Sequence, residues 1–154
     1  MDYLVVKWLH ILSSTLLFGT GLGSAFYMFF VSLTRDTRAI ATVVRYVVIA
    51  DYAFTTPTVI LQPVTGLYLV HLAGFALTST WLVASIALYF LAGACWLPVV
   101  WMQIRMRDMA VSAAANGADL PPRYWRLLKW WVALGSVAFL ALVVVFYLMV
   151  AKPV

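Results

Sequence analysis

The chain has 154 residues, of which 66% are apolar and 10% are charged, and its formal net charge is +5. Soluble domains are roughly 45–50% apolar and about 25% charged, so this composition excludes a soluble domain and predicts one integral membrane domain over residues 1–154. The basic residues lie between apolar segments and form no long stripe, which argues against nucleic acid and favours the lipid bilayer as partner. A single cysteine, Cys95, excludes a disulfide framework and a thiolate metal cluster.

Four apolar segments define the expected architecture, and they cover residues 3–33, 39–73, 80–104 and 127–151. Each is longer than the roughly 20 residues that a membrane-spanning helix needs, and none shows the alternation of a β-barrel strand. The sequence therefore predicts an all-α fold, a four-transmembrane-helix bundle. Arginines and lysines crowd the first and third connections, whereas residues 74–80 carry no charge. By the positive-inside rule, both termini then face away from the cytoplasm.

The first segment carries a histidine, His10, on a helical stripe of small and polar residues that includes Ser14, Gly21 and Ser24. Small and polar side chains at a spacing of three and four indicate a face that contacts protein. Such a face is typical of close helix packing, and it also permits the close approach of a flat ligand. Lys7 lies one turn outward of His10.

The second segment is the least lipid-like, because it contains an acid, an amide, several threonines and two prolines. Polar side chains in hydrocarbon are costly and usually face a bundle interior or a cavity, and each proline tends to kink its helix. One stripe can form a polar pocket or a proton relay: Asp51, Thr55, Thr58 and Gln62. The alternative is a structural Asp51 that pairs with Arg45 or with a neighbouring tyrosine.

The last two segments contain helix-breaking and turn-forming residues and few polar side chains. Pro98 predicts a kink, and Trp96 and Trp101 indicate either an interfacial belt or the wall of a pocket. Residues 110–122 are the only loop-like stretch of any length, with turn signals at 116–117 and 121–122. The basic, tryptophan-rich residues 123–131 are typical of an interfacial anchor.

The two histidines suggest a cofactor. His10 and His71 each lie roughly 38 Å of helix from an arginine at the basic end of their own segment, so they fall at similar height on neighbouring helices. Two histidines on facing helices of a bundle are what axial ligation of a b-type haem needs. Lys7 then pairs with a propionate, and Ser14 or a backbone carbonyl binds the second ring nitrogen of His10. On a straight helix His71 lies opposite the Gln62 stripe, unless Pro63 changes the phase.

Several motifs resemble known families. Lys7-Trp-Leu-His10-Ile, followed by a glycine-containing stretch and Ala25-Phe-Tyr-Met, resembles the start of HemJ-type protoporphyrinogen oxidases and related copper-resistance membrane proteins. That resemblance implies a haem on His10. A second resemblance is carried by residues 50–57, 61–66, 95–98 and 148–153. Over nearly the whole chain, the sequence is similar to uncharacterised bacterial four-span membrane proteins known as a domain of unknown function. That resemblance implies a multi-pass protein of the bacterial inner membrane, and the positive-inside rule then places both termini in the periplasm.

Four functions remain open at this point. The leading hypothesis is a b-type haem protein that transfers electrons or supports a membrane redox assembly, with a redox partner protein or a second copy of the chain as partner. The second is a HemJ-like oxidase of a tetrapyrrole such as protoporphyrinogen. The third is a small metal or proton carrier without haem, built on Asp51, Gln62 and the histidines. The fourth is a structural subunit without a cofactor, so the residues leave open whether the chain is an enzyme.

Overall fold

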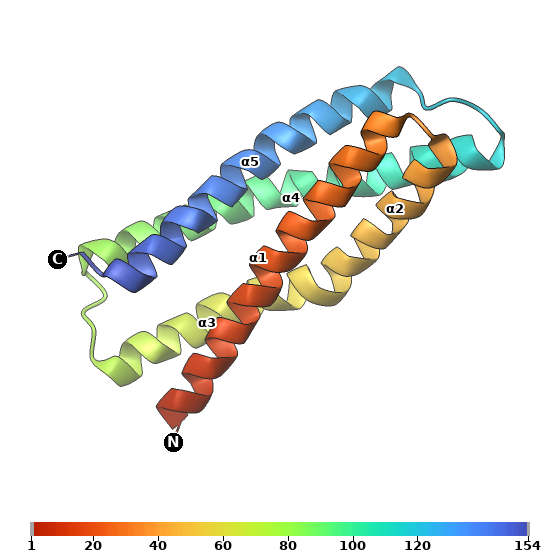
Figure 1. The fold of residues 1–154 in the computed structure, drawn as a ribbon. Coiled ribbons are helices and arrows are strands. Elements are labelled where there is room, and N and C mark those ends of the chain that lie inside the picture. Colours follow the sequence, from red (N-terminus) through yellow and green to blue (C-terminus); the bar gives the residue numbers. More distant parts are fainter. Residues whose placement is uncertain (1, 154) are drawn as a thin grey trace.

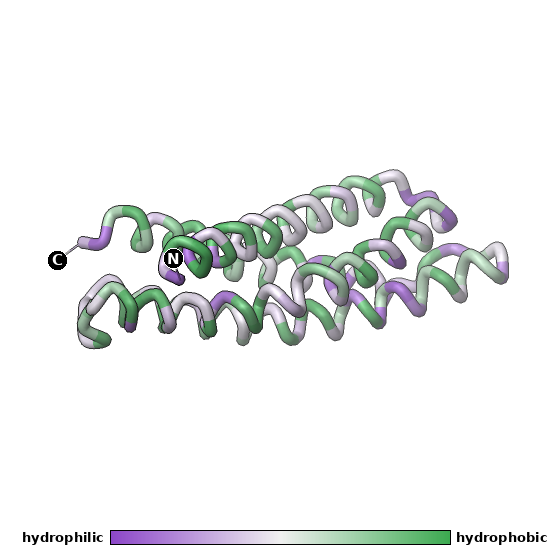
Figure 2. The backbone as a smooth tube through the Cα atoms, turned by 90° about the horizontal axis from the view of Figure 1, so that it is seen from below, coloured by the Kyte–Doolittle hydropathy of each residue, from purple (hydrophilic) through white to green (hydrophobic). Residues whose placement is uncertain are grey.

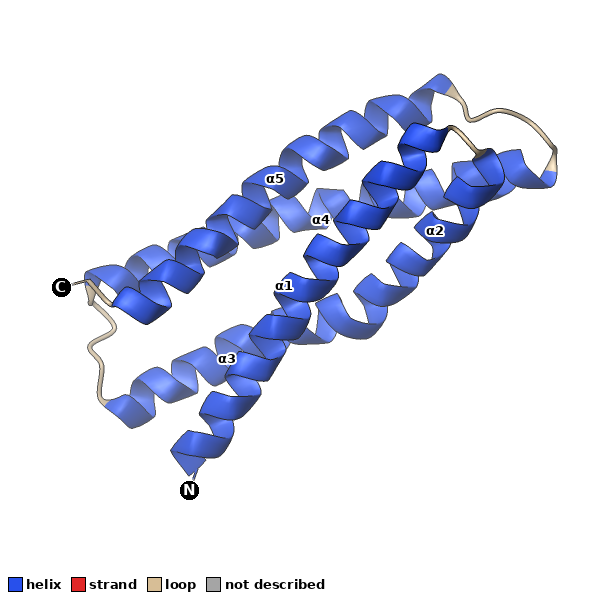
Figure 3. Ribbon diagram, viewed as in Figure 1, coloured by secondary structure: helices blue, strands red, loops and turns tan. Residues whose placement is uncertain are grey.

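The computed structural model describes residues 2–153, and every regular element in that range is helical. Figure 3 shows long helices joined by short connections. Four helical stretches are long and apolar enough to cross a membrane, which confirms the predicted fold class. The elements are α1 (Asp2–Thr34), α2 (Thr37–Ala50), the π-helical turn η1 (Asp51–Thr55), α3 (Thr56–Ala73), α4 (Thr80–Ala115) and α5 (Pro122–Ala151).

The second span is built from α2, η1 and α3 in series, so the bundle has an up-and-down order. Figure 1 shows both termini at the same end as the α3–α4 connection, with the α1–α2 and α4–α5 connections at the opposite end. Hydrophilic residues gather at the end that holds those two connections, whereas the middle parts of the helices are mostly apolar (Figure 2). The charged connections therefore share one end, as the topology argument requires.

Helix α4 is longer than expected, and this corrects the predicted loop at residues 110–122. The helix continues to Ala115, because the alanine-rich stretch 110–115 has high helical propensity. It ends where Gly117 adopts a left-handed conformation with φ of 62°, and the Ala118 amide donates to the Ala113 carbonyl. This is the usual way for a glycine to terminate a helix, so the true connection covers only residues 116–121.

The core is densest toward the basic end of the bundle. Helix α5 packs mainly on α4, and α2 packs on α4 and α1. Met28, Ile40, Met106 and Tyr124 are fully buried there. The Tyr124 hydroxyl lies 2.9 Å from Oγ of Ser32, which donates to a carbonyl of its own helix at 2.7 Å. Because the hydrogen of Ser32 is engaged, Tyr124 donates to Ser32 and links α5 to α1.

Two prolines shape the second span, and each affects the carbonyl four residues earlier. Pro57 follows η1, where the helix widens and the Thr56 amide donates to the Asp51 carbonyl five residues back. Pro63 cannot donate to the carbonyl of Val59. That carbonyl instead accepts a hydrogen bond of 2.6 Å from the hydroxyl of Tyr89 on α4. Pro57 thus follows a π turn, and the carbonyl that Pro63 leaves free is bound by a neighbouring helix.

At the opposite end, Lys152 at the end of α5 contacts aromatic rings at the α3–α4 connection. The ammonium group of Lys152 lies 4.6 Å from the ring centre of Phe75 and 5.9 Å from that of Trp81. The two rings make an edge-to-face contact with centroids 5.4 Å apart. Cations are attracted to aromatic faces, so Lys152 holds the end of α5 against this connection.

Candidate functional site

A large, partly open cavity lies between the helices and defines the candidate site. It has a volume of about 590 Å³, and its walls come from α1, η1, α3, α4 and α5. Most of the walls are apolar side chains. Phe18 of α1 and Phe139 of α5 belong to its wall and stack on each other with ring centroids 5.0 Å apart. Pockets for small molecules usually measure about 300–1,000 Å³, so this cavity has room for a ligand rather than for a few waters.

Missing side chains help to create this space. Gly21 of α1, Gly93 of α4 and Gly135 of α5 all line the cavity. A Cβ atom built on any of the three would meet nothing within 4 Å. Small residues in membrane helices commonly allow two helices to approach closely. These three glycines do not allow close helix packing here, because the space beside them is empty. The small-residue stripe predicted on the first span therefore borders a cavity.

Three buried polar atoms without a hydrogen-bond partner belong to residues that line this cavity: Oδ2 of Asp51, Oε1 of Gln103 and Nε1 of Trp131. The three residues are 5%, 3% and 5% exposed and come from η1, α4 and α5. Buried polar groups in folded proteins are nearly always paired, so three unpaired atoms on residues that line one cavity indicate that a partner can bind there.

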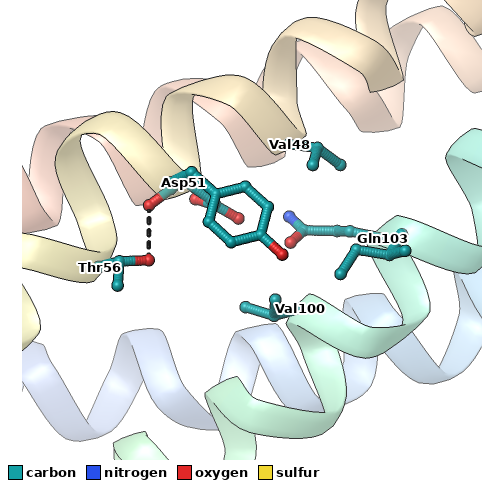
Figure 4. Close-up of a pocket in the computed structure, with 7 residues that line it drawn as sticks. Val48, Asp51, Thr56, Val100 and Gln103 are labelled. Carbon is teal, nitrogen blue, oxygen red and sulfur yellow. Dashed lines mark hydrogen bonds between the residues drawn. The ribbon is translucent and has the colours of Figure 1, made fainter.

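Asp51 lines both the large cavity and a smaller one beside it. Its Oδ1 accepts a hydrogen bond of 2.9 Å from Thr55, and its backbone carbonyl accepts one of 3.0 Å from the hydroxyl of Thr56. Beside the large cavity is a second one of about 10 Å³, also lined by Asp51 and Gln103. In Figure 4 the Gln103 amide points toward Asp51 across this small space. The polar end of the site is thus shared between the second and third spans.

The predicted polar stripe is brought onto one buried face, and its four members do different things. Asp51 and Thr55 line the large cavity. Thr58 of α3 donates to the carbonyls of Phe54 and Thr55 in η1, at 2.7 and 2.9 Å. Gln62 donates to the backbone carbonyl of His10 at 2.9 Å and so joins α3 to α1. The alternative of an Asp51–Arg45 pair is not what forms: in the described residues, the ion pair is Arg107–Asp108.

His10 is half-buried between α1 and α3. Its Nδ1 lies 2.7 Å from Oγ1 of Thr65, whose hydroxyl donates to the carbonyl of Leu61 at 2.7 Å. Since a hydroxyl has one hydrogen, Thr65 accepts from His10, and the ring carries its proton on Nδ1. The ring also lies against Gly66, where an added Cβ would come 3.2 Å from its Cε1 atom. The lone pair of Nε2 is then free to bind a metal ion.

The other predicted haem-site residues do not gather around His10. His71 is exposed, and it lies nine residues from Gln62, about half a turn away from the face that contacts α1. Ser14 donates to the carbonyl of Ile11 at 2.7 Å, so the ring nitrogen of His10 is bound by Thr65 instead. Lys7 is exposed, with its ammonium group 5.8 Å from the ring centre of Tyr3. Within residues 2–153 no group of three or more His, Cys, Asp or Glu is arranged to hold a metal ion.

Sequence reasoning missed Gln103, Tyr89 and Trp131. Gln103 is an amide in an apolar segment, and the argument applied to Gln62 would have found it. Trp131 was assigned to an interfacial anchor, yet it is buried and lines the cavity. Nothing in the sequence marks Tyr89, because its role depends on which carbonyl Pro63 releases and on how α4 is rotated.

The fold and the cavity define a class: a four-span integral membrane protein with a small-molecule-sized cavity among its helices. The family model described as "Predicted integral membrane protein (DUF2269)" matches residues 4–153. The chain therefore belongs to this uncharacterised family of membrane proteins. Neither the comparison with curated proteins nor the comparison with solved structures found a match.

Proposed function

We propose that this protein binds a largely apolar small molecule within the membrane, in the 590 Å³ cavity, and holds its polar group with Asp51, Gln103 and Trp131. The observation that carries the proposal is that three residues lining one cavity each have a buried polar atom without a hydrogen-bond partner. Leaving a buried donor or acceptor without a partner costs about 1–3 kcal/mol each. A ligand with hydrogen-bonding groups removes that cost, and apolar walls select a molecule that already dissolves in the bilayer.

The small residues of the cavity allow a test by filling the space. Gly135→Leu places a side chain into the cavity, where an added Cβ meets nothing within 4 Å. Gly19→Leu is the matched control, because Gly19 is exposed, does not line the cavity and also has free space around it. Organic extracts of the purified proteins are compared by mass spectrometry. We expect a small molecule that is enriched with the wild type and the control and lost with Gly135→Leu; equal enrichment in all three contradicts the proposal.

A second candidate function is haem binding through His10. The observation that favours it is the fixed tautomer, because Thr65 holds the Nδ1 proton and leaves Nε2 free for iron. Among the described residues that line the large cavity, none is His, Cys or Met, so a haem ligated by His10 lies outside that cavity. Haem b supplies one-electron chemistry, and electron transfer to a partner protein and HemJ-like oxidation of a tetrapyrrole both rest on it. Lys7, exposed one turn outward, is available to a propionate.

Absorption spectra of the purified protein test this second proposal. His10→Ala is expected to abolish the haem spectrum. His71→Ala identifies His71 as second ligand if a six-coordinate spectrum becomes five-coordinate. A full wild-type spectrum in His10→Ala shows that His10 is not the iron ligand.

We also propose that the chain lies in the bacterial inner membrane with both termini in the periplasm. The support is the positive-inside rule, together with the shared end of the two arginine-rich connections. A reporter that works only in the periplasm, fused after residue 154, is expected to be active. Activity of a cytoplasm-only reporter at the same position contradicts this orientation.

A further inference from the structure

Asp51 introduces an acid into the bundle without a basic partner. Among residues 2–153 the ion pair that forms is Arg107–Asp108, in the charged region of the third span. Asp51 is 5% exposed, Oδ1 accepts one hydrogen bond from Thr55, and Oδ2 has no partner. A buried carboxylate is strongly unfavourable unless a positive charge or several donors compensate it. A carboxyl that binds a proton escapes this cost, and so does a carboxylate that pairs with a cation from outside the chain.

The aromatic walls of the cavity that Asp51 lines are suited to a positive charge. Trp96 and Tyr89 of α4 and Trp131 of α5 line the same cavity. The Tyr89 hydroxyl is already bound to the Val59 carbonyl, so its ring is what remains for a ligand. Aromatic faces attract organic cations, and the attraction is greater where water is excluded. Gln103 adds an unpaired acceptor oxygen, which suits a donor such as an ammonium N–H.

We infer that the molecule bound in the cavity is an organic cation, a hydrophobic amine. This inference rests on the proposed function and names its ligand class. The ammonium group donates to Asp51 and Gln103, and its charge cancels that of the carboxylate; the N–H of Trp131 pairs with an acceptor elsewhere in the ligand, because an ammonium has none. The hydrocarbon part lies among the apolar walls. A neutral alcohol of the same shape satisfies an acceptor but leaves the carboxylate uncompensated, so the site prefers the amine.

Two probes with one carbon skeleton separate charge from shape. The amine 2,2-diphenylethylamine is protonated at neutral pH, and 2,2-diphenylethanol is neutral. Binding of each to the purified protein in detergent is measured by equilibrium dialysis, with Gly135→Leu as the background for partition into micelles. We expect the wild type to bind the amine at least ten-fold more tightly than the alcohol. Asp51→Asn should remove that preference, so that it binds the amine and the alcohol about equally.

Further variants make the result decisive. Asp108→Asn removes an acid outside the cavity and should keep the ten-fold preference. Asp51→Glu keeps the negative charge and should also keep the preference for the amine. This variant tests the role of the charge even if Asp51→Asn fails to fold. Equal binding of amine and alcohol by the wild type overturns the organic-cation inference and leaves the proposed cavity function standing. Binding of neither probe above the Gly135→Leu background overturns the cavity function itself.

Discussion

The hydrogen bond from Tyr89 to the Val59 carbonyl offers a direct test of how the second span is held. Tyr89→Phe removes the donor and keeps the ring. The carbonyl has no helical partner, because the residue four positions later is Pro63. A buried acceptor left unpaired costs about 1–3 kcal/mol, whereas hydrogen bonds between membrane helices average about 0.6 kcal/mol and reach about 1.7. We expect Tyr89→Phe to lower the free energy of unfolding by about 1 kcal/mol.

The reason for this loss is testable in a double-mutant cycle. Pro63→Ala restores an amide hydrogen at position 63, and that amide can donate to the Val59 carbonyl. Tyr89→Phe should then cost much less in the Pro63→Ala background than in the wild type, with a coupling of about 1 kcal/mol. Reversible unfolding in mixed micelles supplies the four free energies. The same cost in both backgrounds would refute the reasoning that proline creates the need for this tyrosine.

Three further predictions concern contacts between helices. Gly66→Ala gains up to about 1 kcal/mol of helix propensity, but the added methyl group crowds the His10 ring, and such crowding usually costs about 1–3 kcal/mol. We therefore expect the variant to melt at a lower temperature than the wild type. A higher melting temperature contradicts this. Tyr124→Phe should cost about 1 kcal/mol in unfolding experiments, and adding Ser32→Ala should cost little more, since both remove one hydrogen bond. Lys152→Met should raise amide hydrogen exchange in residues 74–79, whereas Lys152→Arg, which keeps the cation, should not.

Sequence reasoning succeeded where the property belongs to a single helix. Four spans, their antiparallel order and the buried face of Asp51 and Gln62 follow from apolar length, charge and spacing. The distortion of the second span follows from its prolines. Pairing between helices was not accessible in this way, because it depends on how one helix is rotated against the next. Thr65 in place of Ser14 as the partner of His10 illustrates this.

The cavity was also beyond the sequence. A glycine on a helix looks the same whether a neighbouring backbone or empty space faces it, so Gly21 was compatible with close packing and with a ligand. Only the positions of α4 and α5 decide between the two. Gln103 was accessible in principle, since an amide in an apolar segment is unusual, but its nearness to Asp51 requires two spans to be placed together.

The π turn changes which helices the second span contacts along its length. Before it, α2 packs on α4 and on α1; after it, α3 packs mainly on α1, and Figure 1 shows α3 and α4 diverging toward the end that carries their connection. One residue more or fewer within 51–55 would rotate everything that follows by about 100°. Gln62 and Thr65 would then lose His10, although every loop kept its length. The chain should therefore tolerate insertions at residues 116–121 far better than a single deletion at 51–55, and the cavity occupies the place where the crossing changes its neighbour.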